Sequence, residues 1–65
     1  MTLYNKTTKV MKFGKARFEC VLPASSSAGT RGAAVEIDAL KKIGLAGEWK
    51  KVMQGIDAGE IDAVE

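Results

Sequence analysis

The chain has 65 residues, ten basic against eight acidic side chains (net charge +2) and a hydrophobic content of 46%. This length allows one small domain, which buries only about 60% of the surface that its unfolded chain exposes. Cys20 is the only cysteine and histidine is absent, which excludes an internal disulfide and a Cys/His zinc site. We therefore expect no metal or other cofactor, and we expect a homodimer or an obligate partner to enlarge the core.

The N-terminal stretch MTLYNKTTKVMKF contains no apolar run of signal-peptide length, and no segment of the sequence is suited to span a bilayer. Asn5-Lys6-Thr7 fits the acceptor pattern for N-glycosylation, which we interpret as a chance match because no secretory signal accompanies it. A single cysteine without such a signal is typical of a reducing compartment. The expected location is therefore cytoplasmic, away from membranes.

Residues 1–22 are predicted to form a β-hairpin. In KVMKFGKARFECVL, Gly14-Lys15 suits a two-residue type II′ turn, because glycine adopts the positive φ that this turn requires. The turn places Lys12 opposite Arg17, and it predicts an apolar face that consists of Met11, Phe13, Ala16, Phe18, Cys20 and Leu22. One apolar and one mostly polar face are typical of a half-buried antiparallel pair. Cys20 is accordingly predicted to be a core residue rather than a reactive thiol.

The segment PASSSAGTRG, residues 23–32, is predicted to be a flexible loop. It contains only small or polar residues and lacks both the phosphate-binding GxxxxGK[ST] spacing and the GxSxG spacing of a nucleophile elbow. Its one candidate functional residue is Arg31, on a loop that would become ordered when it meets a partner.

Residues 33–65 are predicted to form a helical half with an acidic tail. One helical face of about 46–56 carries Trp49, Val52, Met53 and Ile56. A similar stripe over about 33–43 carries Ala33, Ile37, Leu40 and Ile43, with Gly44 where a C-cap glycine belongs. The ending GEIDAVE is left open as a helical turn, a frayed tail or a short edge strand. The predicted class is α+β, with an N-terminal antiparallel β-hairpin packed against two short C-terminal α-helices and with or without a last strand.

A second division of the same half is also open. RGAAVEIDALKKIGLAGEWKKVMQGIDAGEIDAVE can be read as strand, short helix, strand, a turn at residues 57–59, and a final strand. In that reading LKKIGLAGEWKKV resembles the swapped-hairpin barrels of AbrB-type transcription factors, although the proline that usually precedes their helix is absent. RFECVLP followed by LKKIGL resembles a ribbon-helix-helix repressor, but the outward ribbon residues Glu19 and Val21 are poor choices for reading bases. Each resemblance covers about half of the chain at most, and we assign the chain to neither family.

Charge is distributed unevenly along the sequence. Residues 1–31 carry six basic side chains and one acidic one, whereas residues 32–65 carry four basic and seven acidic ones. The basic half predicts a surface for nucleic-acid phosphates, with the candidate residues Lys6, Lys12, Lys15, Arg17 and Arg31. The alternative is that these lysines only protect a strand edge against pairing with another chain.

The second half supplies candidates for protein interaction, which are Trp49, Met53, Glu60 and Asp62. The two apolar side chains lie at a helix edge, and the acidic ones belong to DAGEIDAVE, which lacks the ligand spacing of an EF-hand. Together these patterns favour a small binding protein without enzymatic activity. The first hypothesis is a nucleic-acid-binding accessory or transcription regulator that works as a dimer. The alternative is a phage-type or mobile-element-type inhibitor or adaptor that binds a larger protein or nucleoprotein complex.

Overall fold

The structure is a computed structural model that describes residues 1–14 and 16–65. Its elements are, in order, β1 (Thr2–Asn5), β2 (Met11–Phe13), the 3₁₀ turn η1 (Ala16–Phe18), β3 (Cys20–Leu22), β4 (Val35–Glu36), α1 (Ala39–Gly44), α2 (Trp49–Asp57) and β5 (Ile61–Val64). The predicted α+β class is confirmed, with a hairpin, two C-terminal helices and a short last strand. Within the described residues, no helix is long and apolar enough to cross a bilayer.

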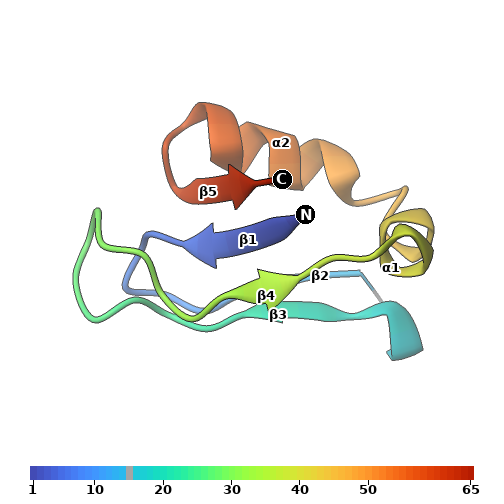
Figure 1. The fold of residues 1–65 in the computed structure, drawn as a ribbon, viewed down its shortest axis with the longest axis horizontal. Coiled ribbons are helices and arrows are strands. Elements are labelled where there is room, and N and C mark those ends of the chain that lie inside the picture. Colours follow the sequence, from blue (N-terminus) through green and yellow to red (C-terminus); the bar gives the residue numbers. More distant parts are fainter. Residues whose placement is uncertain (15) are drawn as a thin grey trace.

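A three-stranded antiparallel sheet in the order β4-β1-β5 forms one layer of the fold. Thr2 lies opposite both Glu36 and Val64, so the first strand occupies the centre and pairs with the last one. The two chain ends consequently lie close together (Figure 1). Leu3 and Asn5 alternate with Thr2 and Tyr4 along β1, and only the first two are buried. This strand differs from the prediction, in which residues 1–22 belong entirely to the hairpin.

The predicted hairpin exists, but its register is wrong. Met11 pairs with Leu22 and Phe13 with Cys20, whereas Lys12 lies opposite Val21 rather than Arg17. The register differs from the predicted one by four residues, which is an even number and therefore leaves the side chains of the paired residues 11–13 and 20–22 on their predicted faces. Phe13 and Cys20 still point to the core, but Lys12 and Arg17 do not lie opposite each other as predicted.

The register differs because residues 16–18 leave the strand and form η1. Gly14 has the predicted positive φ of 84°, and a Cβ atom there would lie only 2.5 Å from Leu45 Cδ2. The Phe18 ring packs directly on Gly44, where an added Cβ would collide with the ring. Gly44 is thus the last residue of α1 and makes room for the ring; it does not act as the predicted C-cap.

The core lies between the three-stranded sheet, the hairpin and α2. Its fully buried apolar members are Leu3, Cys20, Leu22, Ile37, Leu45, Val52 and Ile61. Helix α2 lies along β5 (Figure 1) and directs Val52 inward, with Trp49 and Ile56 partly buried beside it. Gly55 lacks a side chain and so leaves room for Ile61, because a Cβ atom at this position would lie only 2.6 Å from Ile61 Cδ1. The predicted helix over about 46–56 and its core-facing side are therefore confirmed, except that Met53 is 44% exposed.

The predicted helix over about 33–43 is wrong in its first half. Asp38 caps α1, since its Oδ1 accepts a hydrogen bond from the Lys41 amide at 2.7 Å, and the helix begins only at Ala39. Val35–Glu36 forms β4, as the second division of the sequence predicted, and β5 follows a turn in which Gly59 has a φ of 77°. The strand that this division places between the short helix and the turn at residues 57–59 is wrong, because Trp49–Asp57 is helical.

The loop of residues 23–32 makes more contacts than its composition predicts. The amides of Ser25, Gly29 and Gly32 donate hydrogen bonds to the carbonyls of Thr7, Lys6 and Asn5, respectively, at 2.8, 2.8 and 2.9 Å. Ser25 is buried. The backbone of the predicted flexible loop thus lies against residues 5–7.

Candidate functional site

The basic residues predicted to bind phosphates do not gather in one place. The turn that contains Lys6 and the loop that contains Arg31 lie at one end of the molecule, which is 29 Å long. The turn η1, which contains Arg17, lies at the other end beside α1 (Figure 1). Lys12 is exposed in the middle of β2, and Lys15 lies outside the described residues. Phosphate binding by these five residues stays a prediction, but the structure does not make them one continuous patch.

Arg31 is engaged by groups of the protein itself. Its Nη2 lies 2.5 Å from Asp62 Oδ2, and its Nε donates a hydrogen bond to the same oxygen at 2.6 Å. The guanidinium carbon lies 4.6 Å from the centre of the Tyr4 ring, within range of a cation–π interaction. These contacts tie the loop to β1 and β5, so a phosphate would have to compete with the Asp62 carboxylate for Arg31.

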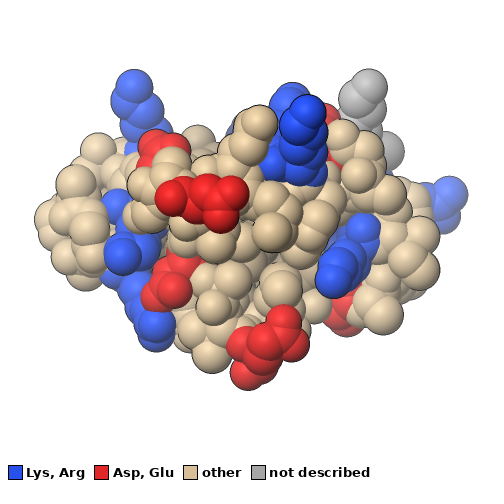
Figure 2. Space-filling model, turned by 90° about the horizontal axis from the view of Figure 1, so that it is seen from above, with Lys and Arg blue, Asp and Glu red and all other residues tan. Residues whose placement is uncertain are grey.

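The charge asymmetry of the sequence does not separate the surface into a basic and an acidic pole on the side of α2. Seen from that side, blue and red side chains alternate over the surface (Figure 2). The pairing of β5 with β1 is one cause, since it brings Asp62 opposite Tyr4 and beside Arg31.

The four residues predicted for protein interaction are also dispersed. Trp49 is half-buried and packs on the core, and Met53 is exposed one turn further along α2. Glu60 is exposed in the turn before β5, where its carbonyl accepts a hydrogen bond from the Lys6 amide at 2.8 Å. Asp62 is held by Arg31 on the sheet. Protein binding by these four residues stays a prediction.

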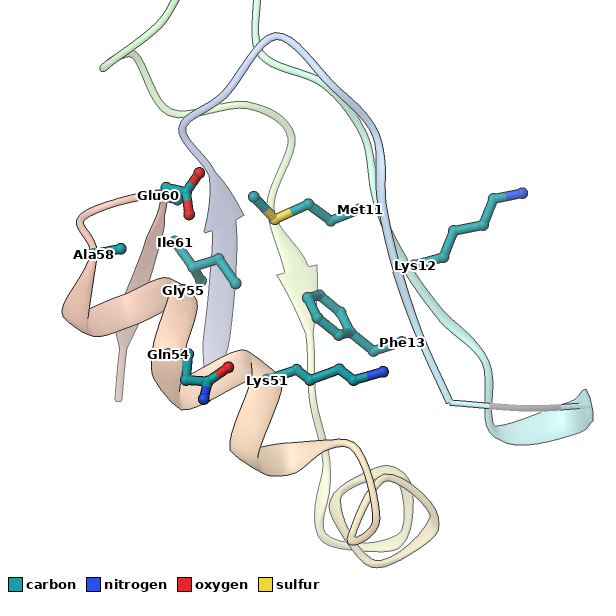
Figure 3. Close-up of a pocket in the computed structure, with 9 residues that line it drawn as sticks. All are labelled: Met11, Lys12, Phe13, Lys51, Gln54, Gly55, Ala58, Glu60 and Ile61. Atoms are coloured by element: carbon teal, nitrogen blue, oxygen red, sulfur yellow. The ribbon is translucent and has the colours of Figure 1, made fainter.

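A groove of about 470 Å³ lies between β2 and α2 (Figure 3). Met11 and Phe13 point from β2 toward Ile61, so the interior of the groove is apolar. Lys51 at its margin is paired with Glu48, with 3.0 Å between Nζ and Oε2. No group of three or more potential metal ligands occurs within residues 1–14 and 16–65. The groove is an opening over the core with Lys51, Gln54 and Glu60 at its margin, whereas the Lys12 side chain points away from it (Figure 3).

The most unusual surface lies on α1. None of the six residues of this helix is buried, and Leu40 and Ile43 are 68% and 72% exposed, more than any other large apolar side chain of the described residues. The two side chains are three positions apart, so they lie on the same side of the helix. Scattered exposed apolar residues are ordinary, but a helix that presents two neighbouring aliphatic side chains to water is typical of an interaction site.

Phe18 continues this apolar region beside the helix. A hollow of about 200 Å³ is lined by Phe18 and Leu40 together with Arg17, Asp38 and Lys41. A second hollow, of about 330 Å³, is lined by Phe18 and Gly44 with Gly14, Gly47 and Glu48. We refer to Phe18, Leu40 and Ile43, with the flanking Arg17, Lys41 and Lys42, as the α1 surface.

Cys20 is 1% exposed, which places it in the core as predicted. Burial raises the pKa of its thiol, while the positive charge of Lys41 acts in the opposite direction. A thiol with a raised pKa is a poor nucleophile, because only the thiolate reacts.

The sequence analysis missed the α1 surface because it placed Leu40 and Ile43 on a buried stripe with Ala33 and Ile37. A signal against that stripe is present in the sequence. Asp38 is a strong helix N-cap, and a helix that begins after it is too short to bury a stripe that starts at residue 33.

Comparison of the chain with protein-family models, with curated proteins and with solved structures finds no match in any of the three. The function must therefore be inferred from the surface of the molecule itself.

Proposed function

We propose that the protein is a small non-enzymatic binding protein that docks on a larger protein through the α1 surface, in the manner of an inhibitor or adaptor. The observation that supports this proposal is the exposure of Leu40 and Ile43 on a helix without a buried residue. Transfer of such side chains from water into an interface is favourable by about 25 cal/mol for each Å² of apolar surface removed. The same side chains gain little from a phosphate backbone, which is why this proposal comes before nucleic-acid binding.

Nucleic-acid binding is kept as the second candidate function. It is favoured by Arg17, Lys41 and Lys42, for which the described residues contain no carboxylate within ion-pair distance. Three cations at one end of a small domain suffice for weak, salt-dependent contact with phosphates.

The experiment that separates the two functions is capture from a lysate of the native cells with the purified protein immobilised. Three forms are compared, namely the wild type, Leu40→Glu and Val10→Glu. The Val10 side chain is also an exposed aliphatic, at 55%, but it lies outside α1, so its variant is matched in chemistry and charge. We expect specific protein capture that the Leu40 variant loses, that the Val10 variant retains and that nuclease treatment leaves intact.

Two results decide against the proposal. Capture that disappears after nuclease treatment identifies nucleic acid as the primary target. Capture that is equal for all three forms shows that the α1 surface is not the binding site. Circular dichroism shows whether the variants remain folded. We expect that they do, because both substituted side chains are exposed.

A further inference from the structure

We infer that the α1 surface takes an acidic amphipathic segment of its partner, with apolar side chains seated beside Phe18, Leu40 and Ile43 and carboxylates placed on Arg17, Lys41 and Lys42. This inference rests on the proposed function and adds the chemistry of the partner to it.

The apolar part of the surface has a shape that favours protruding side chains. Successive residues of a helix are about 100° apart, so Leu40 and Ile43 differ by about 60° and point outward together. Phe18 stands between two hollows of about 200 and 330 Å³, one toward Leu40 and one toward Gly44 and Gly47. Hollows that flank an aromatic ring are suited to the apolar anchors by which an amphipathic helix binds a groove.

Cations flank this apolar part on both sides. The Arg17 guanidinium carbon lies 5.7 Å from the centre of the Phe18 ring, and Lys41 lines the same hollow. On the other side Lys42 Nζ lies 5.1 Å from the centre of the Trp49 ring. Cations held over aromatic rings remain available to a carboxylate, because the ring does not neutralise them.

The nearby carboxylates do not cancel these cations. Asp38 accepts the hydrogen bond from the Lys41 amide at 2.7 Å and caps α1, and Glu19 is exposed next to Phe18 in the sequence. Glu48, at the second hollow, is paired with Lys51 at 3.0 Å. Three cations against the two carboxylates of Asp38 and Glu19 leave the α1 surface with a net positive charge, and complementarity favours acidic side chains around its apolar centre.

Three other occupants fit less well. A second copy of the chain in a two-fold arrangement would place Arg17, Lys41 and Lys42 against the same three cations of the other copy. Nucleic acid would satisfy the cations but leave Leu40 and Ile43 in contact with phosphates. An anionic bilayer would bury the outward side of α1, but a flat surface would leave the two hollows beside Phe18 unfilled.

The test uses a synthetic amphipathic peptide with leucine and phenylalanine on one helical face and glutamate on both flanks. Binding is followed by amide chemical shifts over the whole chain and by Trp49 fluorescence, which responds when Lys42 is drawn away from the ring. We expect saturable binding with a dissociation constant of about 10–100 µM, with shifts centred on residues 17–18 and 39–44. Affinity should fall with salt, because the charges at the rim are exposed.

Single variants separate the apolar from the charged contribution. Leu40→Glu should abolish binding, and Arg17→Glu and Lys41→Glu should each weaken it about fivefold, equivalent to the loss of one rim charge pair and its replacement by repulsion. Lys9→Glu makes the same change in net charge on an exposed residue outside the α1 surface and should alter affinity less than twofold. A peptide with lysine in place of every glutamate should not bind.

Several results overturn the inference. The first is the absence of saturable binding, and the second is equal affinity for the glutamate and lysine peptides. The third is an equal loss of affinity in Lys9→Glu and Lys41→Glu. The fourth is tighter binding of phosphatidylserine vesicles or duplex DNA than of the peptide. Dimerisation of the free protein that Leu40→Glu abolishes would make a second copy the occupant. If the peptide fails while Leu40-dependent protein capture persists, the partner is not acidic but the proposed function stands; loss of that capture refutes the proposed function itself.

Discussion

Asn5 is the only asparagine of the core, and its substitution offers a direct measure of how the two sheets are joined. The side chain is 0% exposed and makes four hydrogen bonds. Its Nδ2 donates to the carbonyls of Lys9 at 2.6 Å and Leu22 at 3.1 Å. Its Oδ1 accepts from the amide and the hydroxyl of Thr7 at 2.8 and 2.7 Å. One side chain thereby connects β1, the following turn and β3.

Asn5→Ala removes all four bonds and leaves the Leu22 carbonyl buried without this donor. Each hydrogen bond contributes about 1 kcal/mol net, and water can replace some of those that are only partly buried, so we expect a loss of about 3 kcal/mol. A domain of this length has a free energy of unfolding of about 3–10 kcal/mol, of which this is a large fraction. The assay is urea unfolding monitored by Trp49 fluorescence. The midpoint should fall, while the slope of the free energy of unfolding against urea concentration should be unchanged.

Two further variants sharpen the measurement. Asn5→Asp keeps the shape but replaces the donating Nδ2 by an oxygen that faces two carbonyls, so the folded state should hold the new carboxyl protonated and raise its pKa. Its stability should accordingly increase as pH falls, whereas that of Asn5→Ala should not follow this trend. Thr8→Ala, an exposed neighbour, is the control. A loss below about 1 kcal/mol in Asn5→Ala, or an Asn5→Asp variant without pH dependence, would show that this reasoning is wrong.

Three other predictions concern the helix end, the first strand and the loop. Gly44→Ala should lower stability by about 1–3 kcal/mol in thermal or urea unfolding, because the added methyl collides with the phenyl ring beside it, whereas Gly47→Ala, with nothing within 4 Å, should be nearly neutral. Hydrogen bonds from a threonine hydroxyl and the terminal ammonium group lower the pKa of Glu36. The carboxylate therefore contributes fully to stability at pH values above the ordinary pKa of glutamate, and this contribution is lost as the pH falls through the lowered pKa. Glu36→Gln should remove this part of the pH dependence of the melting temperature; an unchanged profile would contradict it. In amide exchange, Ser25 and Gly29 should be slower than their neighbours in the loop, and uniformly fast exchange would restore the flexible-loop interpretation.

Local patterns predicted the elements that depend on local interactions. The spacing of Trp49, Val52 and Ile56 predicted α2 and its inner face, and the alternation around Met11 and Cys20 predicted the hairpin faces even though its register is shifted. The predicted faces are correct because the register shift is even. The apolar pattern predicts only which side chains share a face of the hairpin, and an even shift leaves that unchanged.

Long-range pairing was beyond the same patterns. Residues 2–5 form a strand because β4 and β5 pair with them from 32–34 and 56–62 positions away, and no local signal in TLYN predicts either partner. The Asn5-Lys6-Thr7 motif was interpreted as a chance glycosylation match, which agrees with burial of the Asn5 amide, but its role as a core hydrogen-bonding group was not anticipated. The α1 surface was missed for a different reason, since the local N-cap signal of Asp38, after which the helix begins, was given less weight than the apolar stripe.

The pairing of the first strand with the last one also determines when this protein folds during its synthesis. A ribosome that has made residues 1–60 has released no partner for the free edge of β1, and the helix α2 has no strand β5 against which to pack. Leu3 and Val52 therefore stay accessible to chaperones and proteases until residues 61–64 emerge. Closure of the three-stranded sheet follows the synthesis of β5, and a product that lacks this strand cannot cover the free edge of β1.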